Sequence, residues 1–426
     1  MPFSGPAPRL LLECHLVHQL LLENFFKKAP DKIAVAEDVS SAKMTYGDMY
    51  KAIHEANFDI HSAGMSKGDV VAIFIPDSSH LLVYAVAVWQ LGGIVTVIDP
   101  YLSADEIEKR IRLVNAKWTI SRNNWKCSFR TEDEGEKDVL TNVTTKAYHT
   151  FQTGSTEVKN ASKPGISTSE LIVAKVDLAL VVIDQRSKTS ELAAIPFTHY
   201  NVTAAIQILG DTLVFQKRPP GELFLLCFPL WTALGLLLAL HALCSHYHII
   251  LRDRFETHSL RNLLGKYKIN ILTAPLEMLT FLDENDVGEN KLNSVTMVCT
   301  SSNYQSAQKV NSVLRDLDST IVVFSMSECL SWPFVSLEIP KNKADRTPVL
   351  VAPNFECKIT DPHEVECHAE VTGDIYVRGP ACATTYLSGE SLADQYGWIK
   401  TNMRGEYSEE DMCLYLLPAT NPEEGR

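Results

Sequence analysis

Residues 68–100 read "GDVVAIFIPDSSHLLVYAVAVWQLGGIVTVIDP", and they carry the strongest indication of the fold. The stretch begins with a short apolar run, continues with an uncharged segment at residues 81–91, and ends in a second apolar run at residues 94–98. Buried parallel strands read as short continuous apolar runs, and the helices that connect them are apolar when both of their sides are covered. We therefore interpret the stretch as strand, helix and strand.

The same alternation extends over much of the chain. Residues 105–114 have helical apolar spacing with Ser103 as a plausible cap, whereas residues 125–170 are polar and predict a long surface excursion. From residue 347 onward the pattern changes to short strands separated by turn residues. The sequence thus predicts an α/β fold, with large, helix-covered, mostly parallel sheets over residues 1–346 and a β-rich, barrel-like subdomain over residues 347–426. The further strand-like runs are "WTISRN", "LALVVID", "ELFLLCFP", "HYHIILR", "INILTAP", "VTMVCTS", "STIVVFS", "FECKITD", "GDIYVRGP" and "MCLYLL".

Composition excludes several classes of function. The chain has 426 residues with a net charge of −13, which disfavours nucleic acid and anionic membranes as partners. Residues 81–98 and 224–244 are uncharged over nearly the length of a membrane span, but Gln90 and Pro229 interrupt them, so we predict no membrane span. Ten cysteines without a secretion signal predict a reducing compartment and a cytoplasmic protein.

Residues 181–206, "VVIDQRSKTSELAAIPFTHYNVTAAI", have the frame of a phosphate-binding loop. A strand, a loop at residues 185–196 and a helix that starts near Thr198 would direct backbone N–H groups at an anion. The loop contains no glycine, although glycine permits the close backbone approach that phosphate binding needs. Thr198 and Asn201 have an alternative role as helix caps, and His199 has one as a hydrogen-bonded structural residue.

The order of these segments resembles the adenylate-forming acyl- and aryl-CoA synthetases, the family of 4-coumarate–CoA ligase and firefly luciferase. The resemblance implies that a carboxylic acid is joined to AMP from ATP with Mg²⁺ and then passed to coenzyme A. It also implies a large N-terminal body followed by a small mobile C-terminal domain. Because the chain stops after "LYLL", near the family's hinge, we expect this lid domain to be absent. The resemblance rests on residues 64–111 above all, and on "LLENFFKKAPDKIAVAED", "MTYGDM", "VAPNFECKITD", "GDIYVRGP" and "GWIKT".

Most nucleotide-binding positions of the family are altered. When Thr198, His199 and Asn201 are aligned with the family's Thr-His-x-Asn, the three glycine positions of the phosphate loop hold other residues, the lysine is replaced and Thr189 survives. The Thr-Gly-Asp that holds the ribose becomes Thr-Asn-Met at residues 401–403. The resemblance therefore predicts a vestigial nucleotide site. The replaced loop positions hold Ser187, Ser190, Ala194 (glycines), Ala193 (lysine) and Leu192 (proline).

The family's Tyr-Gly-x-Thr-Glu motif is better preserved, at residues 324–328. The resemblance implies that Phe324 flanks adenine, that Ser327 supplies a hydroxyl, and that Glu328 binds Mg²⁺. It also assigns Trp231 and Thr232 to the acyl pocket, with Thr232 in place of a histidine. Two of the residues kept from the family's motifs have a structural alternative: Glu328 as a paired carboxylate, and Thr189 as a solvated turn residue.

Two groups of histidines and cysteines have the residue types of metal ligands. Neither has the Cys-x2-Cys spacing of structural zinc sites, so we predict no structural metal. The groups are His241, Cys244, His246 and His248, and Cys357, His363, Cys367 and His368.

Two hypotheses for function follow. The first is a synthetase-like protein without catalytic residues, silent or severely weakened, that binds an apolar carboxylic acid, an acyl-CoA or a protein partner. The alternative is a working ATP-dependent acid–CoA ligase with a divergent site. Removal of one charge-stabilising group commonly lowers an enzyme's rate by about 10²–10³, and several are replaced here. The first hypothesis is therefore favoured.

Overall fold

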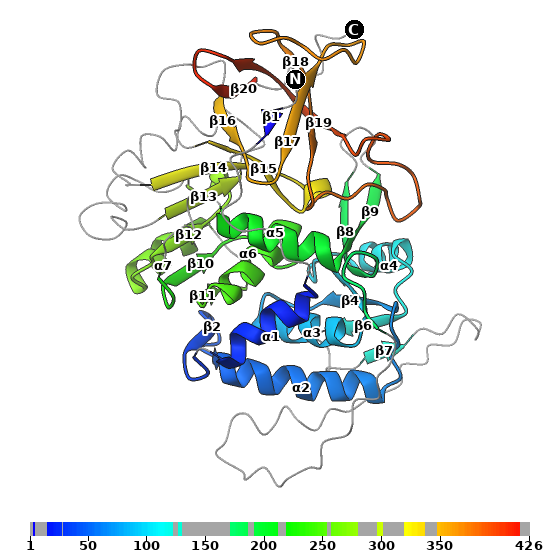
Figure 1. The fold of residues 1–426 in the computed structure, drawn as a ribbon. Helices are drawn as coiled ribbons and strands as arrows, with labels where there is room; N and C mark the ends of the chain where they lie inside the picture. Colours follow the sequence, from blue (N-terminus) through cyan, green and yellow to red (C-terminus); the bar gives the residue numbers. More distant parts are fainter. Residues whose placement is uncertain are drawn as a thin grey trace.

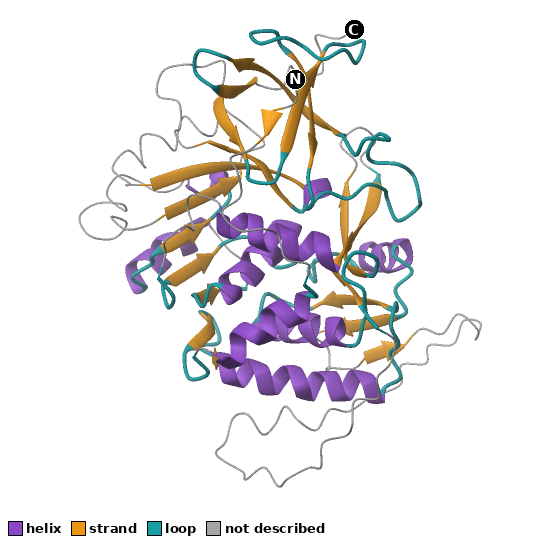
Figure 2. Ribbon diagram, viewed as in Figure 1, coloured by secondary structure: helices purple, strands orange, loops and turns teal. Residues whose placement is uncertain are grey.

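The structure is a computed structural model that describes residues 3–4, 15–27, 29–121, 127–129, 171–185, 191–211, 219–253, 257–279, 296–300, 319–336 and 347–417. These residues form two sheets with helices between and beside them (Figure 1). Figure 2 shows the helices gathered in one part of the molecule and strands alone near the C-terminus.

The larger sheet has fourteen described strands and changes from parallel to antiparallel along its length. Its parallel part consists of β2, β11, β10, β12, β13 and β14, of which all except β2 lie in strand-like runs of the sequence. The antiparallel part continues from β14 through β15 and β16 to β20, β19, β18, β17 and β1. The bounds, in sheet order, are β1 Phe3–Ser4, β17 Glu356–Thr360, β18 Gly373–Arg378, β19 Ile399–Ser408, β20 Cys413–Leu417, β16 Thr347–Val351, β15 Ser331–Ser336, β14 Ser319–Met326, β13 Thr296–Thr300, β12 Ile271–Thr273, β10 Leu223–Leu226, β11 His248–Leu251, β2 Ile33–Glu37 and β3 Lys43–Thr45.

The smaller sheet has six described strands. Its centre is the parallel set β6, β4, β5 and β8, and antiparallel strands lie at both edges. Because the central strands run in one direction, their carboxyl ends meet at one edge, where ligands bind in open α/β sheets. The bounds, in sheet order, are β7 Cys127–Phe129, β6 Trp118–Ser121, β4 Val70–Phe74, β5 Ile94–Val97, β8 Leu178–Gln185 and β9 Leu192–Thr198.

Two helices carry no charged residue because both are buried. Helix α3 (Ser79–Gln90) and helix α6 (Ala233–Cys244) are covered on nearly every side and contribute much of the main core. Helix α1 (Val17–Lys27) contacts both of them, together with α2 (Tyr46–Ser62) and α5 (His199–Asp211). The remaining helices in the described part of the chain are α4 (Ala104–Leu113), α7 (Thr257–Lys266), α8 (Leu276–Leu279) and the 3-10 turn η2 (Ser327–Cys329).

The predicted α/β fold, with parallel sheets and a C-terminal antiparallel sheet, is confirmed. Each strand-like run contains a strand, and Ser103 caps α4 by accepting a hydrogen bond from Glu106 N at 3.3 Å. The uncharged segments are α3 followed by β5, and β10 followed by α6. Within the described ranges no helix has both the length and the apolar character to cross a bilayer.

One local prediction was wrong. Residues 185–196 were expected to be a loop, but β8 runs to Gln185 and β9 begins at Leu192, so the two strands form an antiparallel hairpin. The apolar side chains of β9 are buried when the strand pairs with β8, and this burial favours the strand over a loop. Residues 125–170 were expected to be a long surface excursion, and within them the structure describes β7, which pairs with β6 at the edge of the smaller sheet.

Candidate functional site

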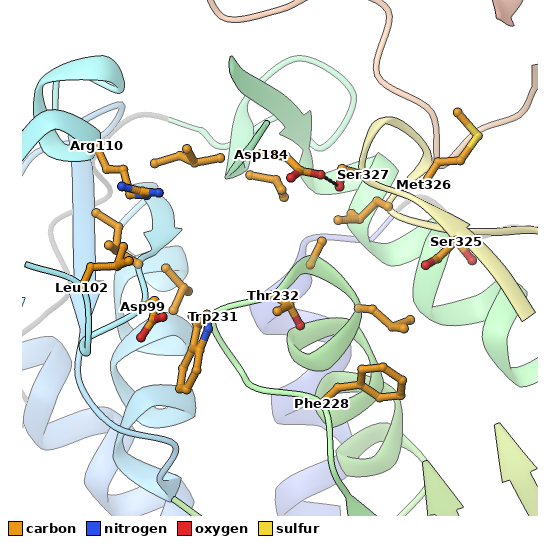
Figure 3. Close-up of a pocket in the computed structure, with 18 residues that line it drawn as sticks. Asp99, Leu102, Arg110, Asp184, Phe228, Trp231, Thr232, Ser325, Met326 and Ser327 are labelled. Carbon is orange, nitrogen blue, oxygen red and sulfur yellow. Dashed lines mark hydrogen bonds between the residues drawn. The ribbon is translucent and has the colours of Figure 1, made fainter. Parts of the chain in front are cut away.

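A cavity of about 440 Å³ opens at the carboxyl ends of β5 and β8 (Figure 3). Its other walls come from the turn before α6 and from the turn between β14 and β15. Segments far apart in sequence thus meet at the sheet edge where ligands commonly bind. The lining consists of Val97, Ile98, Asp99, Leu102, Arg110, Val182, Ile183, Asp184, Phe228, Trp231, Thr232, Ala233, Leu234, Ser325, Met326, Ser327, Leu330 and Ser331.

Trp231 and Thr232, the two residues assigned to the acyl pocket, both lie in this lining. Thr232 Oγ1 donates to the carbonyl of Pro229 at 2.7 Å and accepts from Gly235 N at 3.0 Å, so it is the N-cap of α6. The Trp231 ring meets the Tyr101 ring edge to face, with centroids 5.8 Å apart. The hydroxyl of Thr232 is therefore hydrogen-bonded to backbone groups of the same turn. The turn places the Trp231 indole and the Thr232 side chain at the cavity.

Thr232→Ala should lower the free energy of unfolding by about 1 kcal/mol, because it removes an N-cap acceptor. Thr232→Ser keeps the hydroxyl and should stay close to the wild type. Urea denaturation followed by circular dichroism measures both variants. Equal stability of the alanine and serine variants would contradict the capping role.

Gly235 stands where no side chain fits. A Cβ at this position would lie 2.0 Å from the carbonyl oxygen of Pro229 and 2.9 Å from that of Phe228. The close approach of the two backbone segments sets the position of the cavity wall at Trp231 and Thr232.

Asp184 and Ser327 form the polar end of the cavity. The Ser327 hydroxyl donates to Asp184 Oδ2, and Gln185 N donates to Asp184 Oδ1 at 2.7 Å (Figure 3). Burial, and after it the nearby Asp184 carboxylate, raises the pKa of Glu328. This end of the cavity is therefore electronegative.

The predicted nucleotide-binding residues differ in whether they line the cavity. Ser327 lines the cavity, whereas Phe324 and Glu328 are not among its lining residues. Phe324 is half-buried and packs against the main core, and the Glu328 carbonyl accepts a hydrogen bond from Ala383 N at 2.9 Å. Thr189 lies outside the described residues.

Two further charged residues in the lining were missed by the sequence analysis. Arg110 Nη1 donates to the carbonyl of Glu106 at 2.9 Å and to its Oε2 at 2.5 Å, and Asp99 Oδ1 accepts from Tyr101 N at 2.9 Å. A carboxylate at or just beyond the carboxyl end of a buried parallel strand is a sequence signal that could have identified Asp99, two residues after β5, and Asp184, near the end of β8. Arg110 lies on the charged face of α4, and its sequence context does not distinguish it from Arg112.

Asp77 accepts a hydrogen bond from the backbone of the turn that carries Trp231 and Thr232. Its Oδ1 accepts a hydrogen bond from Leu230 N at 2.9 Å, next to Trp231 in the chain. Burial raises the pKa of Asp77 to about 7, and the carboxylates of Asp253 and Asp99 act in the same direction. Asp77 therefore holds the turn before α6 in place.

The structural alternatives hold for the residues around the start of α5. Thr198 Oγ1 accepts from Asn201 N at 3.2 Å, and Asn201 Oδ1 accepts from Thr198 N at 2.9 Å, so the two form a reciprocal cap. His199 is fully buried and its Nδ1 accepts from Val17 N at 3.3 Å. Thr401, at the family's ribose position, donates to the carbonyl of Ile375 at 2.8 Å within the sheet.

Among the described residues, no group of three or more His, Cys, Asp or Glu side chains is arranged to hold a metal ion. Both histidine and cysteine groups noted in the sequence fall within these residues.

The comparisons with known proteins agree with the geometry. A family model described as "AMP-binding enzyme" matches residues 22–387. "Probable CoA ligase CCL5" of Humulus lupulus is 21% identical over 402 residues, which cover 91% of this chain and 72% of the relative. "4-coumarate--CoA ligase 3" of Arabidopsis thaliana is 21% identical over 442 residues, covering 98% of this chain and 77% of that protein.

Two solved structures have the same fold. The luciferase-like enzyme from the nonluminescent Zophobas morio mealworm superposes with a TM-score of 0.77 at 16% identity and covers 99% of both chains. O-succinylbenzoate coenzyme A synthetase from Bacillus subtilis, in complex with AMP, gives a TM-score of 0.71 at 15% identity and covers 95% of this chain and 98% of that one. The chain belongs to the AMP-binding enzyme family, and its relatives include 4-coumarate–CoA ligases.

Proposed function

We propose that this member of the AMP-binding family binds an apolar carboxylic acid or its CoA thioester, and that its ATP-dependent activation of the acid is weak or lost. The observation that carries the proposal is the open cavity of about 440 Å³, in which apolar side chains lie beside a polar end and a guanidinium group. This volume is within the range of small-molecule sites, which hold ligands mainly by burial at about 25 cal/mol per Å². The binding of an acid needs neither the phosphate loop nor a catalytic group.

Two features support weak adenylation. The family's loop lysine and one of its loop glycines are replaced by Ala193 and Ala194, which are buried in β9 and 6% and 4% exposed. The Asp184 carboxylate at the polar end of the cavity also opposes a polyphosphate more strongly than it opposes a carboxylate, because the Coulomb energy grows with the charge of the ligand. ATP and Mg²⁺ remain the cofactors expected of a working member, with Glu328 at the family's magnesium position.

Calorimetry tests the proposal with a panel of medium-chain and aromatic acids, titrated into the protein without nucleotide. Saturable binding is expected, whereas flat titrations at millimolar acid would overturn the proposal and favour a protein partner. In parallel, thermal shift with ATP·Mg²⁺ and release of pyrophosphate report on activation, because a ligand of the native state raises the melting temperature. A saturable shift at micromolar ATP, together with pyrophosphate release, would establish the alternative of an active ligase.

Arg110→Met should lower the affinity for an acid by about tenfold, because Arg110 is the cation in the described lining and guanidinium groups pair with carboxylates. The amide of the same acid carries no charge, so its affinity should change little. Calorimetry with each acid and its amide measures the difference.

Arg112→Met is the matched control for this variant. Arg112 lies on the same helix, is 70% exposed in its side chain and pairs with Glu108 at 2.8 Å away from the cavity lining. Its replacement should leave both affinities unchanged. If the Arg110 variant binds the acid as tightly as the wild type, Arg110 does not hold the carboxylate.

We also propose a cytoplasmic location. The described cysteines are free thiols, as expected in a reducing compartment.

A further inference from the structure

Two buried thiols from different parts of the chain are in contact beside the cavity. Cys382 Sγ lies 3.4 Å from Cys329 Sγ, although the residues are 53 positions apart in sequence. Cys329 belongs to η2 and is fully buried, and Cys382 follows β18 and is 7% exposed. The contact therefore joins the turn after β14 to the C-terminal antiparallel strands.

The backbone around the two thiols is held close by other contacts. Ala383 N donates to the carbonyl of Glu328 at 2.9 Å, so the neighbours of both cysteines are hydrogen-bonded to each other. On the Cys329 side, the next residues in the chain are Leu330 and Ser331, which line the cavity. The pairing of the thiols thus depends on the same turn that forms one wall of the site.

A disulfide bond needs a sulfur–sulfur distance of about 2.0 Å, so the two sulfur atoms must approach by roughly 1.4 Å from their 3.4 Å separation. Rotation about the two Cα–Cβ bonds and small backbone shifts would have to supply this movement. The remaining requirement is an oxidant small enough to reach buried sulfur atoms.

We propose that Cys329 and Cys382 form a redox modification site, which hydrogen peroxide converts from a dithiol to a disulfide. The thiolate of Cys382 attacks one peroxide oxygen, the O–O bond breaks, and a sulfenic acid and water result after protonation. The sulfur of Cys329 then attacks the sulfenic sulfur, loses its proton, and displaces the second water. One peroxide is thus reduced to two water molecules as two thiols become one disulfide, which thiol reductants reverse.

The surroundings of the two cysteines indicate which sulfur reacts with peroxide and which one then resolves the sulfenic acid. The hydrogen bond between the two sulfur atoms, and after it burial, raise the pKa of Cys329 well above the ordinary value, so Cys329 keeps its proton as the thiol partner in that bond. Cys382 is the more exposed of the pair and is therefore the thiol that peroxide meets first. Cys329, in contact with it, is placed to resolve the sulfenic acid.

Peptide mass spectrometry tests the proposal on the full chain after peroxide treatment and alkylation of the remaining thiols. The peptides of Cys329 and Cys382 should be cross-linked, with the loss of two hydrogens, and dithiothreitol should release them. Cys382→Ser should abolish the cross-link. Recovery of both cysteines in alkylated form, at peroxide concentrations that oxidise the partly exposed Cys413, would overturn the proposal.

The melting temperature gives a second, independent readout. A cross-link that closes a loop of this length restricts the unfolded chain, and we expect a rise of about 5 °C on oxidation. Cys357→Ser is the matched control, because Cys357 is also fully buried but its sulfur contacts the carbonyl of Lys358. The Cys357 variant should keep the peroxide-dependent rise, whereas Cys329→Ser should lose it. A rise that persists in the Cys329 variant would also overturn the proposal.

Discussion

Gly235→Ala should lower the free energy of unfolding by about 3 kcal/mol and weaken the binding of any ligand in the cavity. The added Cβ would lie 2.0 Å from a backbone oxygen, and backbone cannot swing aside as the end of a flexible side chain can. Relief of the clash requires the start of α6 to move away from Pro229. The Thr232 cap and the Trp231 side of the cavity would move with it.

Chemical denaturation of Gly235→Ala and Gly265→Ala measures this effect. Gly265 is in α7, and a Cβ there meets no atom within 4 Å. Its replacement by alanine, a better helix former, should be neutral or slightly stabilising. A Gly235 variant as stable as the Gly265 variant would show that the approach to Pro229 is not tight.

Lowering the pH from 7 to 5 should destabilise the protein by about 4 kcal/mol in net terms. Burial lowers the pKa of His18, His199 and His241 to about 4 in the folded protein, from an ordinary value of 6.5. Between these values the unfolded chain binds more protons than the folded protein, so stability is present above pH 6.5 and is lost as the pH falls. Each histidine contributes about 2 kcal/mol of this loss at pH 5.

Asp77 has the opposite effect on stability as the pH falls. Burial raises its folded pKa to about 7 from 3.8, so the folded state binds the extra proton and gains stability as the pH falls from 7. This gain is about 2 kcal/mol at pH 5 and offsets one histidine. The net loss is therefore smaller than the sum of the three histidines.

Thermal melts across pH 7 to 5 measure the loss, with His199→Asn as the comparison. Asparagine does not titrate, and its Oδ1 can take the place of Nδ1 as the acceptor for Val17 N. The variant should lose less stability on acidification than the wild type. A melting temperature that stays constant across this range would contradict the neutral, buried state of the histidines.

The strands and buried helices could be predicted because a segment that is covered on both sides consists of a continuous run of apolar, uncharged residues. The strand β9 could not, because Pro196 and the resemblance to a phosphate loop both favoured an irregular segment. The strand forms because its apolar residues pair with β8 at the edge of a sheet, where proline is tolerated.

The candidate site was predictable only where a motif marked it. Trp231 and Thr232 were located through the family pattern, and Asp184 carried a weak signal at a strand end. Arg110 and the Cys329–Cys382 pair carried none, because each depends on contacts between distant parts of the chain that no local pattern encodes. The roles assigned to Phe324 and Glu328 at a nucleotide stay predictions.

The pairing of β2 with β11 determines when the N-terminal part of the chain can complete its fold during synthesis. Arg252, next to β11, pairs with Asp38, next to β2, and the two are 214 residues apart. At about 5–20 residues per second, a ribosome needs roughly 10–40 s to make the intervening chain. During this interval one edge of β2 lacks its parallel partner, and an unpaired apolar strand is a template for aggregation. Until β11 has left the ribosome, the nascent chain therefore leaves this edge of β2 without its parallel partner.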